Sequence, residues 1–384
     1  MPSPPYYAPF HEEPTGRAAD FELKLKKLRA LLTELKANAG VLSLANNFAW
    51  LTGGGRNHIF QATEGGVGSI YVDRSRAVLV ANNIEGHRFL NEELAGLPLE
   101  ILEASWYEAK SVQTAAATLS SGGSVLFDTD PSFDSALCTL RQDLSPFDIE
   151  RYRLLGKDCS AVLSQVAHTV RPGLTEWEIG AAIAQRCVTL AIDVVVLLIA
   201  ADDRADTIRH PLPTTKKVVN KVMLVLCGRR GGLIANLTRM VHVSSDSTIP
   251  ADLRRRHDAV TYVDAASLAA TRIGVSAADV LRAIQDAYAS QGFPNEWTLH
   301  HQGGVSGYKG REWLATPSTT TPIKAFHAYA WNPSIAGTKS EDTILLHENG
   351  EVEILTKATD EWPLVRHTIN GKEYARPDIL HIQV

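Results

Sequence analysis

The feature that most constrains the fold is a nine-residue pattern that occurs twice along the chain. Residues 171–179 (RPGLTEWEI) and residues 272–280 (RIGVSAADV) both follow the pattern Arg-x-Gly-aliphatic-hydroxyl-x-x-acid-aliphatic. A hydroxyl residue followed three positions later by an acid is typical of a capping box, which satisfies free N–H groups at the start of a helix. Two such helix starts can arise by chance. Alternatively, an internal duplication places two helix–loop–helix halves over one curved sheet, for which residues 218–227 and 343–348 offer strand-like runs.

The length of the chain predicts more than one domain. Its 384 residues exceed the roughly 250–300 residues at which single hydrophobic cores stop growing. A series of predicted turns and prolines ends near residue 146, and a long helical pattern follows over residues 147–170. We therefore expect an N-terminal domain at residues 1–146 and a C-terminal domain at residues 147–384. The proline-rich residues 1–19 show no periodicity and predict an irregular arm.

The N-terminal part has the pattern of a small α/β domain. Leucines at mostly three- and four-residue spacing predict an amphipathic helix over residues 21–37, closed by Gly40. Short apolar runs bounded by Gly, Asn or Asp predict strands, and helical pattern lies between some of them. The predicted strands are residues 41–44, 69–72, 77–80 and 125–127.

Composition excludes several classes of protein. Apolar residues make up 45% and charged residues 21%, which is typical of a soluble globular chain. A net charge of −5 disfavours a nucleic-acid partner, because proteins that coat a phosphate backbone are usually basic. The four cysteines form no CxxC pair, which argues against a zinc knuckle and a disulfide scaffold. No apolar run reaches about 18 residues and the N-terminus lacks a signal-peptide pattern, so we expect a cytoplasmic protein with no membrane partner.

Five segments of the second half resemble the pita-bread fold of creatinase, aminopeptidase P, prolidase and methionine aminopeptidase. The segments are TIRHPLPT at 207–214, the region 223–239, HHQGGVSG at 300–307, WNP at 331–333 and EDT at 341–343. The resemblance covers roughly residues 148–362, and the N-terminal domain more weakly resembles that of creatinase and prolidase. It implies an α/β (α+β) fold, with a creatinase-like N-terminal domain followed by a pita-bread catalytic domain. It also implies a homodimer in which the N-terminal domain of one subunit closes the site of the other.

The metal ligands of the family do not carry over. Metal-using members hold two divalent ions with two Asp, one His and two Glu. At the corresponding positions this chain has Cys227, Asn236, Gly304, Asn332 and Glu341. One carboxylate and two neutral amides cannot hold two dications against water, so we expect neither a metal nor another cofactor.

Creatinase itself works without a metal, using a histidine as acid and base and arginines to hold the substrate carboxylate. The resemblance implies the same roles for His210, for Arg311, and for Arg56, which corresponds to an arginine that reaches the partner subunit's site. Creatinase keeps glutamates where this chain has Thr238 and Asn332. Because guanidinium recognition needs those anions, creatine is not the expected substrate.

Other candidate residues allow more than one interpretation. Arg311 either forks onto a substrate carboxylate or pairs with Glu341 or Glu312. Glu341 is either a general base or a partner for Arg311, and Cys227 is either a nucleophile or an inert core thiol. Further candidates for substrate binding are His58, Cys227, Asn236, His300, His301, Tyr308 and Asn332.

Two of these groups also have a structural interpretation. His300 and His301 flank a glycine run, so that one points into the site as a second acid or the two form a strand-edge pair. Arg56 and His58 lie in the glycine-rich stretch 52–58, which either presents polar side chains to a ligand or is a surface loop without function.

The sequence thus predicts a metal-independent, creatinase-like enzyme. Its substrate is expected to be a small polar molecule with a carboxylate, in which a C–N or similar bond is cleaved by hydrolysis or elimination. His210 and Glu341 are the expected catalytic residues. The alternatives are a non-catalytic pita-bread binding module and a metallopeptidase of the Xaa-Pro type.

Overall fold

The computed structural model describes residues 14–108, 112–246 and 248–384. Residues 1–13 of the expected irregular arm lie outside this range. The chain folds into two compact units, Met1–Arg151 with Gly231–Leu233 and Tyr152–Arg230 with Ile234–Val384. None of the helices in the described ranges combines the length and the hydropathy needed to cross a bilayer.

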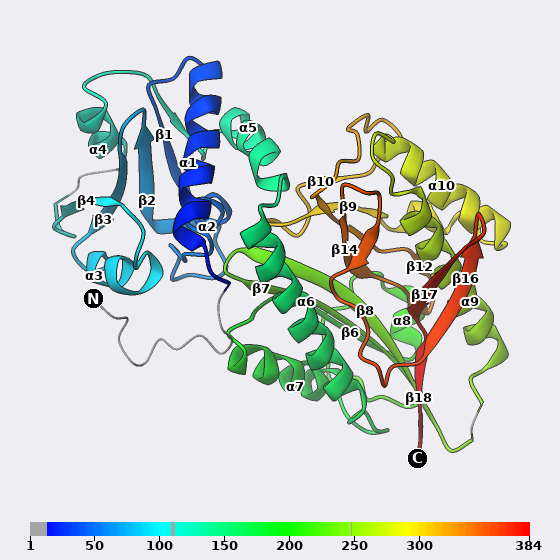
Figure 1. Ribbon diagram of the computed structural model, residues 1–384. Helices are drawn as coiled ribbons and strands as arrows, with labels where there is room; N and C mark the ends of the chain where they lie inside the picture. Colours follow the sequence, from blue (N-terminus) through cyan, green and yellow to red (C-terminus); the bar gives the residue numbers. More distant parts are fainter. Residues whose placement is uncertain (1–13, 109–111, 247) are drawn as a thin grey trace. The chain divides into compact units, whose positions relative to one another are not determined.

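The first unit contains a five-stranded mixed sheet with the strand order β4-β3-β2-β1-β5 (Figure 1). Pairing is antiparallel for β1 with β2 and for β2 with β3, and parallel for β3 with β4 and for β1 with β5. The strands are β1 (Ala39–Leu44), β2 (Gly65–Asp73), β3 (Ala77–Asn82), β4 (Glu100–Ala104) and β5 (Val125–Phe127). The helices are α1 (Arg17–Glu34), α2 (Ala45–Thr52), α3 (Gly86–Arg88), the π-helix η1 (Phe89–Glu93), α4 (Val112–Leu119) and α5 (Pro131–Gln142).

Both ends of the helix predicted over residues 21–37 are wrong, since α1 already begins at Arg17, inside the stretch 1–19 that was expected to be an irregular arm. Helix α1 ends at Glu34 rather than at Gly40, which lies inside strand β1. A Cβ atom at Gly40 would lie 3.1 Å from both Leu32 and Phe133. The glycine therefore permits close packing of helices on the strand and does not end the helix.

The second unit contains two larger sheets and two hairpins. Their strand orders are β18-β8-β7-β6 and β10-β9-β11-β14-β15, with the hairpins β12-β13 and β16-β17. The strands of the first sheet are β6 (Asp193–Ala201), β7 (Lys221–Arg230), β8 (Leu233–Ser244) and β18 (Ile379–Gln383). Those of the second are β9 (Gly303–Ser306), β10 (Trp313–Leu314), β11 (Ala328–Trp331), β14 (Asp342–Leu346) and β15 (Val352–Ile354). The hairpin strands are β12 (Ser334–Ile335), β13 (Thr338–Lys339), β16 (Leu364–Ile369) and β17 (Lys372–Pro377).

Helices pack on these sheets. They are α6 (Pro146–Ala167), α7 (Glu176–Thr189), α8 (Asp203–Thr207), α9 (Ala251–Ala270), α10 (Ala277–Ser290) and the 3-10 helix η2 (Glu296–Leu299). One core cluster joins α9 and α10 to the second sheet, with Val260, Ile284, Val305, Tyr329 and Ile344 all buried. This apolar contact is what the helical spacing and the short apolar strands together require.

The repeated nine-residue pattern begins two helices in equivalent settings. Thr175 and Ser276 are the N-caps of α7 and α10, and each forms an isolated bridge to a segment that follows in the same half, at Lys217 and Pro322. At Thr175 the capping box is complete. At Ser276 only the cap itself forms, because the shorter Asp279 carboxylate bonds the serine hydroxyl instead of the backbone.

An isolated β-bridge between Thr238 and Glu341 is one of the contacts that join the two halves of this unit. The Thr238 N–H of β8 donates to the Glu341 carbonyl at 3.1 Å, and the Thr238 hydroxyl donates to the Glu341 carboxylate at 2.9 Å. Glu341 thus lies at the seam between the two sheets, with its side chain held from β8.

We expect two glycine-to-alanine substitutions in neighbouring helices to have opposite effects. A Cβ at Gly156 in α6 would lie 2.2 Å from the Leu355 carbonyl oxygen, whereas at Gly180 in α7 it meets only the end of the Leu197 side chain, at 3.2 Å. G156A should lower the free energy of unfolding by about 1–3 kcal/mol. G180A should leave it unchanged or raise it by up to about 1 kcal/mol, because alanine favours helix. Urea denaturation of both variants tests this, and equal stabilities would contradict the packing described.

Candidate functional site

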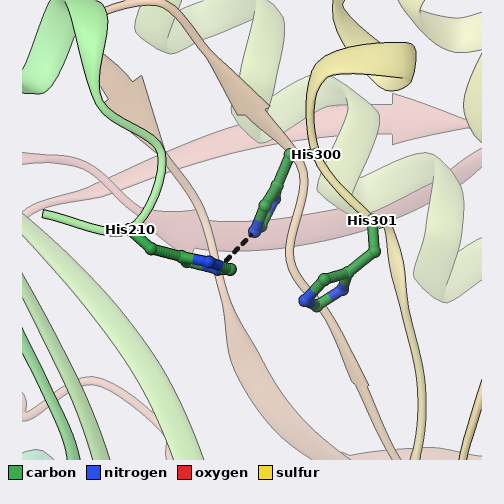
Figure 2. A group of neighbouring side chains, drawn as sticks. All are labelled: His210, His300 and His301. Carbon is green, nitrogen blue, oxygen red and sulfur yellow. Dashed lines mark hydrogen bonds between the residues drawn. The ribbon is translucent and has the colours of Figure 1, made fainter.

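Three histidines from two distant segments meet in the second unit (Figure 2). His210 lies in the loop between α8 and β7, and His300 and His301 lie between η2 and β9. The Nε2 atoms of His210 and His300 are 3.0 Å apart, and the rings of His300 and His301 are centred 4.5 Å apart. The structure therefore brings together all three histidines that the sequence singled out, with His300 buried and the other two exposed.

Both histidine segments are held by neighbouring polar side chains. Arg209 pairs with Glu296 of η2 and donates to the Ser334 hydroxyl at 3.0 Å. The Gln302 side chain donates to the His300 carbonyl at 2.6 Å and accepts from the Tyr288 hydroxyl at 3.1 Å. These contacts fix the backbone on either side of the imidazole contact.

All three imidazoles favour the neutral form. Burial, together with the Lys339 charge, lowers the pKa of His300 to about 2. His210 and His301 are exposed as whole residues, but partial burial of their rings still lowers their pKa values. The Arg311 charge adds to this at His301, where the pKa falls to about 4, and the Lys339 charge adds to it at His210. At neutral pH the His210–His300 contact is therefore a hydrogen bond between two neutral rings, in which one Nε2–H donates to the other Nε2.

A buried carboxylate between two cations lies next to the histidines. The Lys339 Nζ is 2.7 Å from Glu341 Oε2, and an Arg311 guanidinium nitrogen is 3.0 Å from Glu341 Oε1. Burial alone would raise the pKa of Glu341, but Lys339 and Arg311 outweigh it and lower that pKa to about 2. The Arg311–Glu341 pair left open by the sequence is thus present. The carboxylate is a weak base in this setting, which favours a positioning role for Glu341 over that of a general base.

The five positions that hold metal in the resembled enzymes do not fit a pair of divalent ions here. The Asn236 amide donates to the Ser306 hydroxyl at 2.8 Å, and the Glu341 carboxylate is shared by Lys339, Arg311 and Thr238. A Cβ at Gly304 would lie 2.0 Å from the Trp313 carbonyl oxygen, so no longer side chain is accommodated at that position. Divalent ions of this kind need several anionic or imidazole ligands, and the one carboxylate present already binds an ammonium.

The three histidines alone are a poor substitute for those ligands. Their ligating nitrogens all lie within 4.8 Å of one another, which a single metal ion would require. Metal-ligating histidines normally donate their second ring N–H to a partner, but the buried Nδ1 of His300 has no hydrogen-bond partner. The Lys339 and Arg311 charges, which already lower the histidine pKa values, also repel a dication. A hydrogen-bonded imidazole cluster fits these contacts better than a metal centre.

Cys227 and two buried polar residues complete the neighbourhood. Burial raises the pKa of the Cys227 thiol to about 12, which disfavours a thiolate and therefore the nucleophilic alternative. Asn332 is buried, its side-chain Oδ1 has no hydrogen-bond partner, and its backbone N–H donates to the Gln302 carbonyl at 3.3 Å. Tyr308 is also buried, only three residues before Arg311.

The remaining two candidates belong to the first unit. Helix α2 ends at Gly53, whose left-handed φ of 62° turns the chain into the glycine-rich stretch that carries Arg56 and His58. The Arg56 Nε donates to Glu93 Oε1 at 3.0 Å, and its side chain remains half exposed. The Arg56 guanidinium is therefore held by Glu93 but remains accessible to solvent.

Lys339 is the residue that sequence reasoning missed. It lies in the short polar stretch GTKSED between β12 and β14, which has the pattern of an exposed turn. Its side chain is nevertheless only 4% exposed. Its spacing of two residues from Glu341 was the available signal, since alternate residues of an extended segment share a face.

Comparison with known proteins identifies a family and a set of similar folds. The sequence model of metallopeptidase family M24 matches residues 150–348, more than half of the chain. No curated protein matches the sequence. The fold confirms the expected pita-bread architecture preceded by an α/β domain, because solved structures superpose over nearly the full length.

Three of these structures show which kinds of protein share this fold. A Xaa-Pro dipeptidase from Bacillus anthracis superposes with a TM-score of 0.74 at 16% identity, covering 94% of this chain and 100% of its own. The dipeptidase PepE from Mycobacterium ulcerans gives 0.70 at 18% identity, covering 96% and 100%. The N-terminal domain of the FACT complex subunit SPT16 from chickpea (Cicer arietinum) gives 0.67 at 9% identity, covering 89% and 97%.

We expect His300 to make the protein less stable in acid. The unfolded chain binds a proton at this residue below about pH 6.5, whereas the folded chain, with a pKa of about 2, does not. The free energy of unfolding therefore falls as pH falls, by about 1.4 kcal/mol per pH unit for this group. In H300Q the decline between roughly pH 6 and pH 4 should be shallower by that amount. Urea denaturation across this range measures both slopes, and parallel curves would show that His300 is protonated in the folded protein.

Proposed function

Because the chain belongs to metallopeptidase family M24, we propose that it is an enzyme of this family that works without a metal. It cleaves a C–N or similar bond, by hydrolysis or elimination, in a small polar molecule that carries a carboxylate. His210 is the acid and base of the reaction, and Arg311 holds the substrate carboxylate. Asn236, Asn332, His300, His301 and Tyr308 shape the binding site.

One observation carries this proposal. At the position of the last metal-binding glutamate, the Glu341 carboxylate binds an ammonium and a guanidinium instead of facing a metal site. Burial and the Lys339 charge favour a neutral His210, and the two cations together attract an anion. A histidine that is unprotonated at neutral pH and an excess of positive charge are the requirements of proton transfer on an anionic substrate.

The proton path is simple in either reaction. In hydrolysis, His210 takes a proton from water while the water oxygen bonds the carbon, and the resulting imidazolium returns the proton to the nitrogen as the C–N bond breaks. In elimination, His210 takes a proton from the carbon next to the C–N bond, the electron pair forms a double bond as the C–N bond breaks, and the resulting imidazolium gives the proton to the departing nitrogen. His300, 3.0 Å from His210, accepts or donates the hydrogen bond that orients the ring in both cases.

Subunit assembly and location stay predictions from the sequence. We propose a homodimer in which Arg56 and His58 of one subunit reach the site of the other, in keeping with the half-exposed Arg56 guanidinium. No nucleic-acid or membrane partner is proposed, and the expected location is the cytoplasm.

The likeness to SPT16 supports a second candidate function. That protein is named as a subunit of a complex, so the fold is not confined to proteins named as peptidases. In a non-catalytic binding module, the histidine cluster would be a structural hydrogen-bond network. The variant experiment below separates the two functions.

We expect H210A to abolish turnover without unfolding the protein. A thermal-shift screen of small carboxylate-bearing amides and amines identifies ligands, and mass spectrometry of the incubated ligands detects cleavage. Removing a general acid–base residue should lower kcat by about 10²–10⁴-fold, while the melting temperature stays close to that of the wild type. A matched control, H347A, replaces a partly exposed histidine that pairs with Glu353. Undiminished turnover in H210A would refute the assignment.

Elemental analysis tests the metal-free mechanism separately. Protein purified without chelator should contain well under one equivalent of zinc, manganese or cobalt per chain, because the ligand positions hold too little negative charge. Turnover should persist after treatment with EDTA. Two equivalents of metal, together with metal-dependent cleavage of Xaa-Pro dipeptides, would establish the metallopeptidase alternative instead.

A further inference from the structure

The ion cluster around Glu341 carries more positive than negative charge. Lys339 and Arg311 are two cations, and among the described residues the ion pairs of both involve only Glu341. The Lys339, Arg311 and Glu341 side chains are 4%, 13% and 3% exposed, so water screens this charge weakly. The cluster therefore holds one net positive charge in a largely buried position.

The neighbouring buried ions do not compensate for it. Arg239 is 3.0 Å from Asp342, and Arg376 is 2.7 Å from Asp264 and 2.6 Å from Asp342. Two arginines and two aspartates thus form a separate network with matched charges. The excess charge stays with Lys339 and Arg311.

Both cations also keep hydrogen-bond donors without acceptors. The Lys339 ammonium has three N–H donors, and its one described contact is with Glu341. The Arg311 Nε–H is buried and has no hydrogen-bond partner. Buried donors normally find an acceptor, so the unpartnered Arg311 Nε–H, next to a carboxylate that a second cation shares, indicates that a bound anion completes the cluster.

We propose that Lys339 and Arg311 form a fixed site for one carboxylate group, in which Lys339 supplies the positive charge that other members of the family obtain from metal. The charge of the cluster matches a single negative charge, which favours a monocarboxylate over a dicarboxylate or a phosphate dianion. The natural ligand rests on the proposed function, whereas the anion site itself does not.

The reach of the Lys339 charge supports this role. Burial is the largest cause of the lowered pKa values of His210 and His300, and the Lys339 charge is the second largest. The Lys339 charge also lowers the pKa of His301. An anion bound at Lys339 would therefore lie within electrostatic range of His210. Glu341 acts here as a positioning residue, because it holds both cations in place.

A series of charge variants in the full-length protein tests the proposal, with ¹³C-labelled acetate as the probe and NMR line broadening as the measure of binding. K339M leaves one cation and one anion, and should weaken acetate binding by about tenfold or more. E341Q keeps the size of the side chain and one acceptor oxygen that positions the cations but removes the negative charge, and should tighten acetate binding. The double variant K339M/E341Q restores one net positive charge through Arg311 alone, and should bind more tightly than K339M. K221M is the control, because Lys221 forms a 2.9 Å pair with Asp206 that is more exposed.

If the ion cluster only stabilises the fold, the order of acetate affinities will not follow the charge of the cluster. Both single variants will then bind acetate more weakly than the wild type. The proposal is overturned if K339M binds acetate as tightly as the wild type, if E341Q binds it no more tightly, or if the wild type shows no saturable binding. If K339M does not fold, as judged by circular dichroism, E341Q and the double variant still decide. The double variant leaves no unpaired partner of the buried Lys–Glu pair. Acetate binding without any turnover would contradict the enzyme proposal but not the anion site, and turnover without acetate binding would do the reverse.

Discussion

The pairing of Glu341 with Lys339 and Arg311 is the interaction on which the chemistry of this chain depends. A buried carboxylate needs a cation, and in this fold the need can be met either by bound metal ions or by side chains. Here an ammonium 2.7 Å away and a guanidinium 3.0 Å away meet it. That choice leaves a net positive charge beside the three histidines, which adds to the effect of burial in favouring their neutral forms.

The architecture places these groups with few contacts. Two similarly capped helix pairs cover two sheets, and the sheets join where Thr238 binds both the backbone and the side chain of Glu341. His210 and His300 come from opposite sides of that seam and are linked by a single hydrogen bond. The ion cluster is therefore anchored to the backbone at the seam, whereas the histidines are held by loops that Arg209 and Gln302 fix.

The fold class was predicted because five short segments of the second half resemble those of a known family. His210, His300 and Asn332 were named as candidates because they lie in those segments. Lys339 was not found, because its burial results from long-range packing around a stretch that is polar in sequence. The bounds of helix α2 were not predicted for a related reason, since six of its eight residues are buried and no amphipathic period marks it. The ionisation of Glu341 and of the imidazoles also depends on neighbours that are distant in sequence.

The tight packing at Gly304 limits which side chains this position can carry. The position that corresponds to a metal-binding histidine now faces the Trp313 carbonyl, with room for a hydrogen atom but not for a carbon. Introducing a histidine here would meet a steric barrier, because strand β10 would first have to shift. A single substitution at this position therefore cannot supply a metal ligand while β10 stays packed on β9.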